Sequence, residues 1–187
     1  MSGQHFDGLP ALEGPRFANG QPVTEGGDYP FRLITYKEIF GGQSRTSPSN
    51  LWLDELLPEN AVLMNRLDAE KLGLRNGDRV RLGSATNPDG AFDLGNGEIR
   101  HVEGKLKVLE GMRPGVVAVS WHFGHWASGS RDVIVDGKIV KGDPKRARGL
   151  CTNPILLEDK TVENVCLTDP IGGSASFYDT HVKIVHI

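Results

Sequence analysis

The sequence of 187 residues has few cysteines and no long apolar run, and each absence excludes a class of protein. Its two cysteines, Cys151 and Cys166, do not form a CxxC pair. Alone they cannot hold an iron–sulfur cluster or a thiolate zinc site. No stretch approaches the roughly 18 consecutive apolar residues of a membrane-spanning helix, and the N-terminus lacks the basic and apolar regions of a signal peptide. We therefore expect no direct membrane insertion by these residues.

An excess of positive charge is also missing. The formal net charge is −3, and 38% hydrophobic with 24% charged residues is close to the globular average. Four basic residues gather in "KGDPKRARG", but a solvated loop accounts for them. We therefore expect a folded protein and no nucleic-acid partner.

Strand-like segments dominate what is present. Alternation of apolar and polar residues and β-branched runs predict eight strands, at residues 30–36, 61–65, 78–84, 104–110, 115–121, 132–137, 163–169 and 180–187. One short helix is predicted in "RLDAEKLG", where the glycine ends it. Residues 1–29, rich in glycine and proline, predict an extended arm or interdomain linker before a domain at 30–187. Many short strands favour a mainly β barrel, with an antiparallel sandwich as the alternative.

The stretch "SWHFGHW", residues 120–126, is the first candidate site. A β-branched run precedes it and a turn-like segment follows, so the histidines do not share a helix face as zinc ligands would. A glycine that admits a close approach, two flat tryptophans and two imidazoles suit a flat heteroaromatic ligand. The alternative is that the segment only ends a buried strand. The candidate residues are His122, Gly124, His125 and Trp126.

Two further polar stretches could share that ligand. "GGQSRTSPSN" follows the first strand, and its backbone amides, hydroxyls and guanidinium suit phosphate or the polar edge of a heterocycle. A polar surface loop is the alternative there, as turn formation is for Asn153 in "CTNPILLED". Neither a nucleophile elbow nor a GxGxxG motif is present, so these stretches favour binding over bond cleavage. The candidates in the first loop are Gln43, Ser44, Arg45, Thr46 and Asn50.

Taken in order, these segments resemble the C-terminal molybdopterin-dinucleotide-binding domain of the dimethyl-sulfoxide-reductase superfamily of molybdenum and tungsten oxidoreductases. The resemblance rests on four segments and runs from about residue 29 to the end: "FRLITYKEIFGGQSRTSPSN", "LMNRLDAEKLGLRNGDRVRL", "EGKLKVLEGMRPGVVAVSWHFGHW" and "TNPILLED…DPIGGSASFYDTHVKI". The pattern N-x-x-D-A-x-x-L-G-x-x-x-G-D-x-V is met from Asn65 to Val80. The "HFGHW" and "DPIGG" stretches are most similar to tetrathionate, thiosulfate and polysulfide reductases, with arsenic oxyanion enzymes as close neighbours.

The resemblance implies a six-stranded double-psi β-barrel, with short helices and an extended N-terminal arm, that binds molybdopterin guanine dinucleotide. It places the first loop, the His122 to Trp126 loop and Asn153 against the pterin, and Asn65 and Asp68 near the nucleotide. It implies no catalytic residue and no ligand to molybdenum or tungsten in this chain, which alone would be inert. The whole enzyme would reduce a sulfur or arsenic oxyanion.

The same resemblance implies partners, because complete catalytic subunits of this superfamily are several times longer. They carry the metal ligand and any iron–sulfur cluster in other domains, and they pair with electron-transfer and membrane-anchor subunits. Both a periplasmic and a cytoplasmic enzyme are compatible with this. Three alternatives stay open: a small separate subunit that completes a pterin site, a β-barrel zinc protein or hydrolase that uses His122 and His125, and an interaction module without cofactor.

Overall fold

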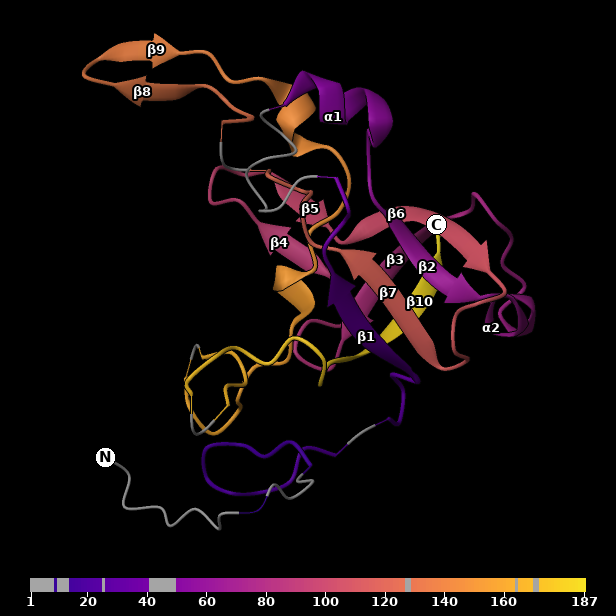
Figure 1. The fold of residues 1–187 in the computed structure, drawn as a ribbon. Helices are drawn as coiled ribbons and strands as arrows, with labels where there is room; N and C mark the ends of the chain where they lie inside the picture. Colours follow the sequence, from indigo (N-terminus) through magenta and orange to yellow (C-terminus); the bar gives the residue numbers. More distant parts are fainter. Residues whose placement is uncertain are drawn as a thin grey trace.

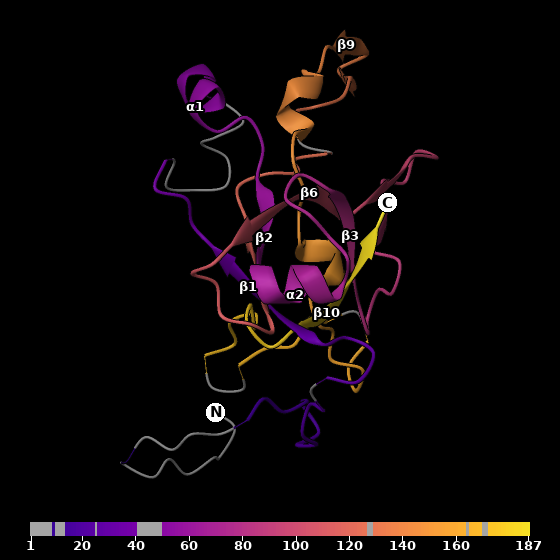
Figure 2. The same cartoon turned by 90° about the vertical axis from the view of Figure 1, so that its right-hand side faces the viewer.

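The fold is a closed β-barrel with several projections. A computed structural model describes residues 9, 14–24, 26–40, 50–126, 129–163, 165–169 and 172–187. Six strands close the barrel in the order β1-β10-β3-β6-β2-β7 (Figures 1 and 2). Their bounds are Phe31–Tyr36 for β1, His181–His186 for β10, Arg79–Ser84 for β3, Glu103–Leu109 for β6, Ala61–Asn65 for β2 and Val116–Ser120 for β7.

Two strand pairs of the barrel are parallel and four are antiparallel. β1 lies parallel to β7 and β2 lies parallel to β6, whereas the remaining neighbours run in opposite directions. Parallel pairs need crossover connections, so the chain passes over the barrel twice instead of turning back in hairpins. The mainly β, six-stranded double-psi barrel is confirmed, and the alternative of an antiparallel sandwich is wrong.

The core fills the inside of this barrel. Alternate residues of the strands point inward, as the pattern BiBiBi of buried and half-buried residues along β1 shows. Each large aliphatic side chain removed from water stabilises the fold by about 1.5–3 kcal/mol. The largest fully buried side chains are Leu33, Met64, Leu82, Leu106, Leu150, Ile155, His122, Val62, Val80, Val102, Val117 and Val119.

Two short α-helices begin where an asparagine caps them. In α2 (Arg66–Lys71) the Asn65 side chain accepts from the backbone N–H of Leu67, and Gly73 ends the helix with φ +68°. This is the predicted helix, and it covers one end of the barrel (Figure 2). α1 (Leu51–Leu56) was not predicted, and its cap is Asn50.

Outside the barrel, the smaller elements differ from the sequence prediction in three places. β8 (Val133–Val135) and β9 (Lys138–Val140) form a hairpin where one strand was predicted, and β4 (Ala91–Asp93) pairs with β5 (Ile99–His101) in a hairpin that was not predicted. The strand predicted at 163–169 is wrong. Its described residues make only isolated bridges, at Cys166 and Thr168. Two 3-10 turns, η2 (Pro144–Ala147) and η3 (Asn153–Ile155), complete the secondary structure.

Part of the N-terminal arm docks against the loop that precedes β10. Phe17 is buried, with the Lys160 ammonium 5.0 Å from its ring centroid. The backbone N–H of Ala18 donates to Asp159 Oδ2 at 2.6 Å. The arm is therefore anchored by one aromatic side chain and one charged hydrogen bond, while the domain boundary at residue 30 stays a prediction. Among the described residues, no helix is long and apolar enough to cross a membrane.

Candidate cofactor-binding site

The parallel pair β1 and β7 brings the first two candidate loops together. Because the strands run side by side in the same direction, with Tyr36 opposite Ser120, their following loops leave from the same end. The backbone N–H of Glu38 donates to His122 Nε2 at 3.1 Å, and Lys37 Nζ lies 5.5 Å from the centroid of the Trp121 ring. The two residues that follow β1 are thus tied to the histidine loop, whereas residues 41–49 of the "GGQSRTSPSN" stretch lie outside the described residues.

His122 is fully buried at this end of the barrel. Its Nε2 accepts a backbone hydrogen bond, so in the neutral ring the proton is on Nδ1. The ring stacks on Trp121, with centroids 5.4 Å apart and planes at 24°. An Nε2 that accepts from an amide has no lone pair left for a metal. Among the described residues no group of three or more His, Cys, Asp or Glu could hold a metal ion.

The rest of the histidine loop folds back on itself. His125 is half-buried, and its Nε2 lies 3.2 Å from the His122 carbonyl oxygen. Trp126 packs into the core, 6.1 Å from the Phe92 ring, and its carbonyl accepts from Ser130 Oγ at 2.6 Å. Of the two, His125 therefore keeps accessible surface for a ligand, whereas Trp126 mainly fixes the loop.

Gly124 allows a close approach, but the segment that approaches is part of this chain. Its φ is +72°, and a Cβ placed there would lie 2.5 Å from the backbone nitrogen of Cys151. Its own N–H donates to the carbonyl of Arg148 at 2.8 Å. Close packing of two backbone segments therefore accounts for a glycine at this position, and its contact with a ligand stays a prediction.

Asn60 was missed in the sequence, yet it joins the end of β7 to residue 150. It is 2% exposed. Its Nδ2 donates to the carbonyls of Ser120 at 2.6 Å and Leu150 at 2.9 Å, and its Oδ1 accepts from the N–H of Leu150 at 2.9 Å. A lone asparagine before a strand carries no sequence signal for this role.

Tyr36 ends β1 beside Glu38. Burial, then the Glu38 carboxylate, raises the pKa of Tyr36 from 10.0 to about 12. An unfolded tyrosine loses its proton near pH 10, so this contribution to stability is complete below that pH and is lost as pH rises toward 12.

We predict that a phenolate absorbance titration shows one tyrosine ionising near pH 12, because the folded chain holds that proton. Tyr36→Phe should remove that component, and the control Tyr178→Phe, at a 57% exposed position, should retain it. Loss of the component in the control alone would contradict the assignment.

The structure places the other candidate residues in different environments or does not describe them. Gln43, Ser44, Arg45 and Thr46 lie outside the described residues. Asn50 Oδ1 caps α1 by accepting from the N–H groups of Trp52 and Leu53 at 3.0 and 3.3 Å. Asn153 is exposed at the start of η3, two residues after the segment that packs on Gly124.

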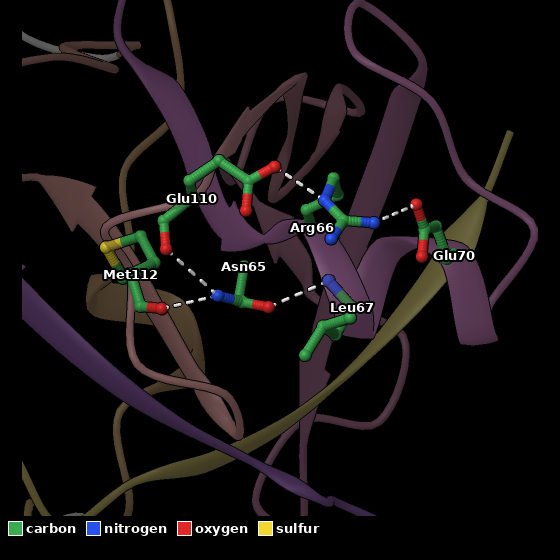
Figure 3. Close-up of polar contacts among 6 residues, drawn as sticks. All are labelled: Asn65, Arg66, Leu67, Glu70, Glu110 and Met112. Carbon is green, nitrogen blue, oxygen red and sulfur yellow. Dashed lines mark hydrogen bonds and ion pairs between the residues drawn. The ribbon is translucent and has the colours of Figure 1, made fainter.

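Asn65 and Asp68 lie at the opposite end of β7 from His122. Asn65 Nδ2 donates to the carbonyl of Met112 at 2.6 Å, beside the Arg66 ion pairs with Glu70 and Glu110 (Figure 3). Asp68 Oδ2 accepts from the N–H of Gly115 at 2.6 Å. Both side chains therefore hold the turn that leads into β7, and their predicted contact with the nucleotide stays a prediction.

A cavity of about 310 Å³ lies elsewhere, between the docked arm and the barrel. Phe17, Tyr29, Leu157 and His181 are among its lining residues, and none of the candidate site residues lines it. This cavity is therefore separate from the candidate site residues that the structure describes.

Comparison with known proteins shows the family of this chain. Residues 31–177 match the family described as the molydopterin dinucleotide binding domain. A selenate reductase subunit of Mesobacillus selenatarsenatis is 44% identical over all of this chain, which covers 18% of that protein. A tetrathionate reductase subunit of Salmonella typhimurium is 28% identical, again over all of this chain and over 17% of that protein. The chain thus spans less than a fifth of either relative.

A solved structure supports the fold alone. Acetylene hydratase from Pelobacter acetylenicus superimposes with a TM-score of 0.56 and 16% identity, over 85% of this chain and 18% of that one. The family match covers far more than half of the sequence, and it favours cofactor binding over the zinc or hydrolase alternative. The chain belongs to the molydopterin dinucleotide binding domain family.

Proposed function

We propose that this chain is the dinucleotide-binding part of a larger molybdenum or tungsten oxidoreductase, and that the loops after β1 and β7 hold the pterin. One observation carries the proposal: the Glu38 N–H to His122 Nε2 bond ties the two loops into one surface. Of all the candidate loops, these two leave adjacent parallel strands at the same end.

The side chains at this end fit such a cofactor. A dinucleotide carries a diphosphate, and two exposed cations lie near the loops, Lys37 over the Trp121 ring and Arg146 beside Gly129. A pterin is flat and has donors and acceptors on its edges, and Trp121 and His125 are half-buried with a π face and a ring nitrogen. Asn153 adds an exposed amide. The chemistry of these groups therefore matches both halves of the ligand.

In this proposal the residues bind and orient, and the bound molybdenum supplies the two-electron chemistry. His122 fixes the loop by accepting from Glu38 and stacking on Trp121. His125 and Asn153 contact the pterin edge. Gln43, Ser44, Arg45 and Thr46 are proposed contacts from the sequence pattern. Their donors would lower the electron density on the pterin, which tunes the metal without ligating it.

We infer that the whole enzyme reduces an oxyanion of selenium or sulfur, which the names of the two relatives support. The sequence predicts an oxyanion of sulfur or arsenic, and selenium comes from the name of the first relative. Residues that contact the substrate and ligate the metal would come from the remainder of the protein, as would any iron–sulfur cluster. Electron-transfer and membrane-anchor subunits are further proposed partners.

The test is cofactor retention by the whole subunit that carries this chain. His125→Ala should weaken retention of molybdopterin about tenfold, since one hydrogen bond to a ligand is worth roughly 1.4 kcal/mol. The readout is pterin fluorescence after oxidative release, together with metal content per subunit. His186→Ala is the matched control, because its ring is exposed on β10 near Asp78 and far from the loops. Equal retention by both variants would overturn the proposed contact.

A further inference from the structure

The hairpin β8–β9 exposes aliphatic side chains on both of its faces. All six strand residues are exposed. Val133 pairs with Val140, Ile134 with Ile139 and Val135 with Lys138. Because cross-strand partners share a face, Ile134 and Ile139 form one face, and the valines form the other. The isoleucine side chains are 77% and 65% exposed, and the valine side chains are 46–50% exposed.

This hairpin is nevertheless preformed. Asp136 and Gly137 both have positive φ, at +49° and +73°, the conformation of the two-residue turn that matches strand twist. At its base the Lys141 ammonium lies 2.6 Å from Asp132 Oδ2, and the N–H of Gly142 donates to Asp132 Oδ1 at 3.1 Å. A lone two-stranded hairpin is marginal in water. The turn and the contacts at its base stabilise this hairpin, although no described residue covers its apolar faces.

The hairpin projects from the same side as the candidate site. It follows the histidine loop as α1 follows the loop after β1, and both project upward in Figures 1 and 2. α1 adds Trp52 and Leu56, four residues apart and 83% and 62% exposed. The Asp54–Arg148 ion pair joins α1 to the segment after the hairpin. Exposed apolar side chains on α1 and on the hairpin therefore both lie on the side of the barrel where the loops after β1 and β7 begin.

We propose that β8–β9 is a tongue that inserts into a groove of the remainder of the same catalytic subunit, clamping the cofactor between the two parts. Apolar side chains on both faces require cover on both faces, so a groove fits and a flat surface does not. We identify the protein that covers the hairpin from the position of the hairpin and from the length of the relatives. The other side of the cofactor must be held by protein at this end, and this chain covers 18% of its 44% identical relative.

Charge indicates what lines that groove. Residues 129–150 contain six basic and three acidic residues, a net charge of +3 in a chain whose formal net charge is −3. The groove should therefore be apolar inside, with acidic side chains at its rim facing Lys138 and Lys141. This inference rests on the proposed function, since the clamp needs the cofactor loops beside the tongue.

Hydrogen exchange tests the tongue in the separate 187-residue chain and in the whole holo-subunit. The hairpin amides should exchange at least about tenfold more slowly in the holo-subunit, since burial suppresses local opening. Ile134→Ser/Ile139→Ser should raise their exchange about a hundredfold there, because two buried side chains are lost. The same variant should leave the unfolding midpoint of the separate chain unchanged. The control Val162→Ser/Val185→Ser alters two exposed positions outside the hairpin and should leave the exchange unchanged.

Other outcomes separate this inference from the proposed function. A holo-subunit with full cofactor and unprotected hairpin amides overturns the tongue and leaves the proposed function standing. Protected amides in a subunit that binds no molybdopterin overturn the proposed function and the clamp, and leave only the insertion of the hairpin standing. Protection that appears in the separate chain with rising concentration, or only after a second subunit is added, overturns the assigned occupant. A reading frame that encodes nothing beyond these residues would also overturn the proposal that the rest of the same subunit covers the hairpin.

Discussion

Asn60→Ala should destabilise the chain by about 3 kcal/mol, a large effect for one amide. The reason lies in Leu150, whose side chain is fully buried against Gly104 of β6, where a Cβ would lie 2.3 Å from Leu150 Cδ2. A buried residue outside a strand needs partners for its own N–H and C=O, and Asn60 supplies both. Removing the amide leaves three buried backbone groups without a partner. Urea unfolding followed by tryptophan fluorescence measures the loss.

Asn87 offers a matched control because it makes the same three-bond pattern at a half-exposed position. Its Nδ2 donates to the carbonyls of Ala91 and Pro154, and its Oδ1 accepts from the N–H of Ala91. Water can replace those bonds after Asn87→Ala, so its loss should be about 1 kcal/mol. Equal losses at both positions would show that burial does not set the cost of removing Asn60.

The barrel could be predicted because its strands alternate in the sequence. The alternation in residues 180–187 predicts the strand that contains β10, and the apolar run "AVLMN" predicts the strand at 61–65, where β2 lies. The periodicity of apolar residues does not predict segments whose conformation depends on their cap or on a distant partner. α1 has only six residues and starts at a cap that equally suits a turn. The segment 163–169 has strand-like composition but finds no continuous partner.

In the candidate site, too, some features could be predicted from the sequence and others could not. Parallel pairing of β1 with β7 puts the ends of these two strands side by side, and that could be expected only through the family resemblance, while the shared contact of the following loops with a ligand stays a prediction. Asn60 and Tyr36 could not be found, since their roles depend on residues up to 90 positions away or on local burial. The burial of Trp126 follows from its contact with the unpredicted β4–β5 hairpin through Phe92.

Gly124→Ala is the second large effect, again about 3 kcal/mol. A left-handed φ of +72° costs alanine about 1–2 kcal/mol, and its Cβ would lie 2.5 Å from the Cys151 nitrogen and 2.8 Å from the Leu150 carbonyl carbon. Those are backbone atoms, so a segment must move instead of a side chain, which adds a penalty like that of overpacking. Thermal unfolding should show the loss. Gly115→Ala is the control, because it shares a φ of +79° but has nothing within 4 Å of its Cβ, and it should lose only about 1 kcal/mol.

The same substitution has a chemical readout at Cys151. Burial raises the pKa of the Cys151 thiol, so little thiolate forms and a disulfide reagent should label it slowly. Gly124→Ala pushes residues 150–151 outward, which hydrates the thiol, lowers its pKa and speeds labelling. The exposed Cys166 would mask this, so the comparison is made in a Cys166→Ser background. Faster labelling without any change in Gly115→Ala would locate the displacement at the junction of the histidine loop and residue 150. Unchanged labelling in Gly124→Ala would mean that the loop yields instead, and retention of molybdopterin by the whole subunit should then fall.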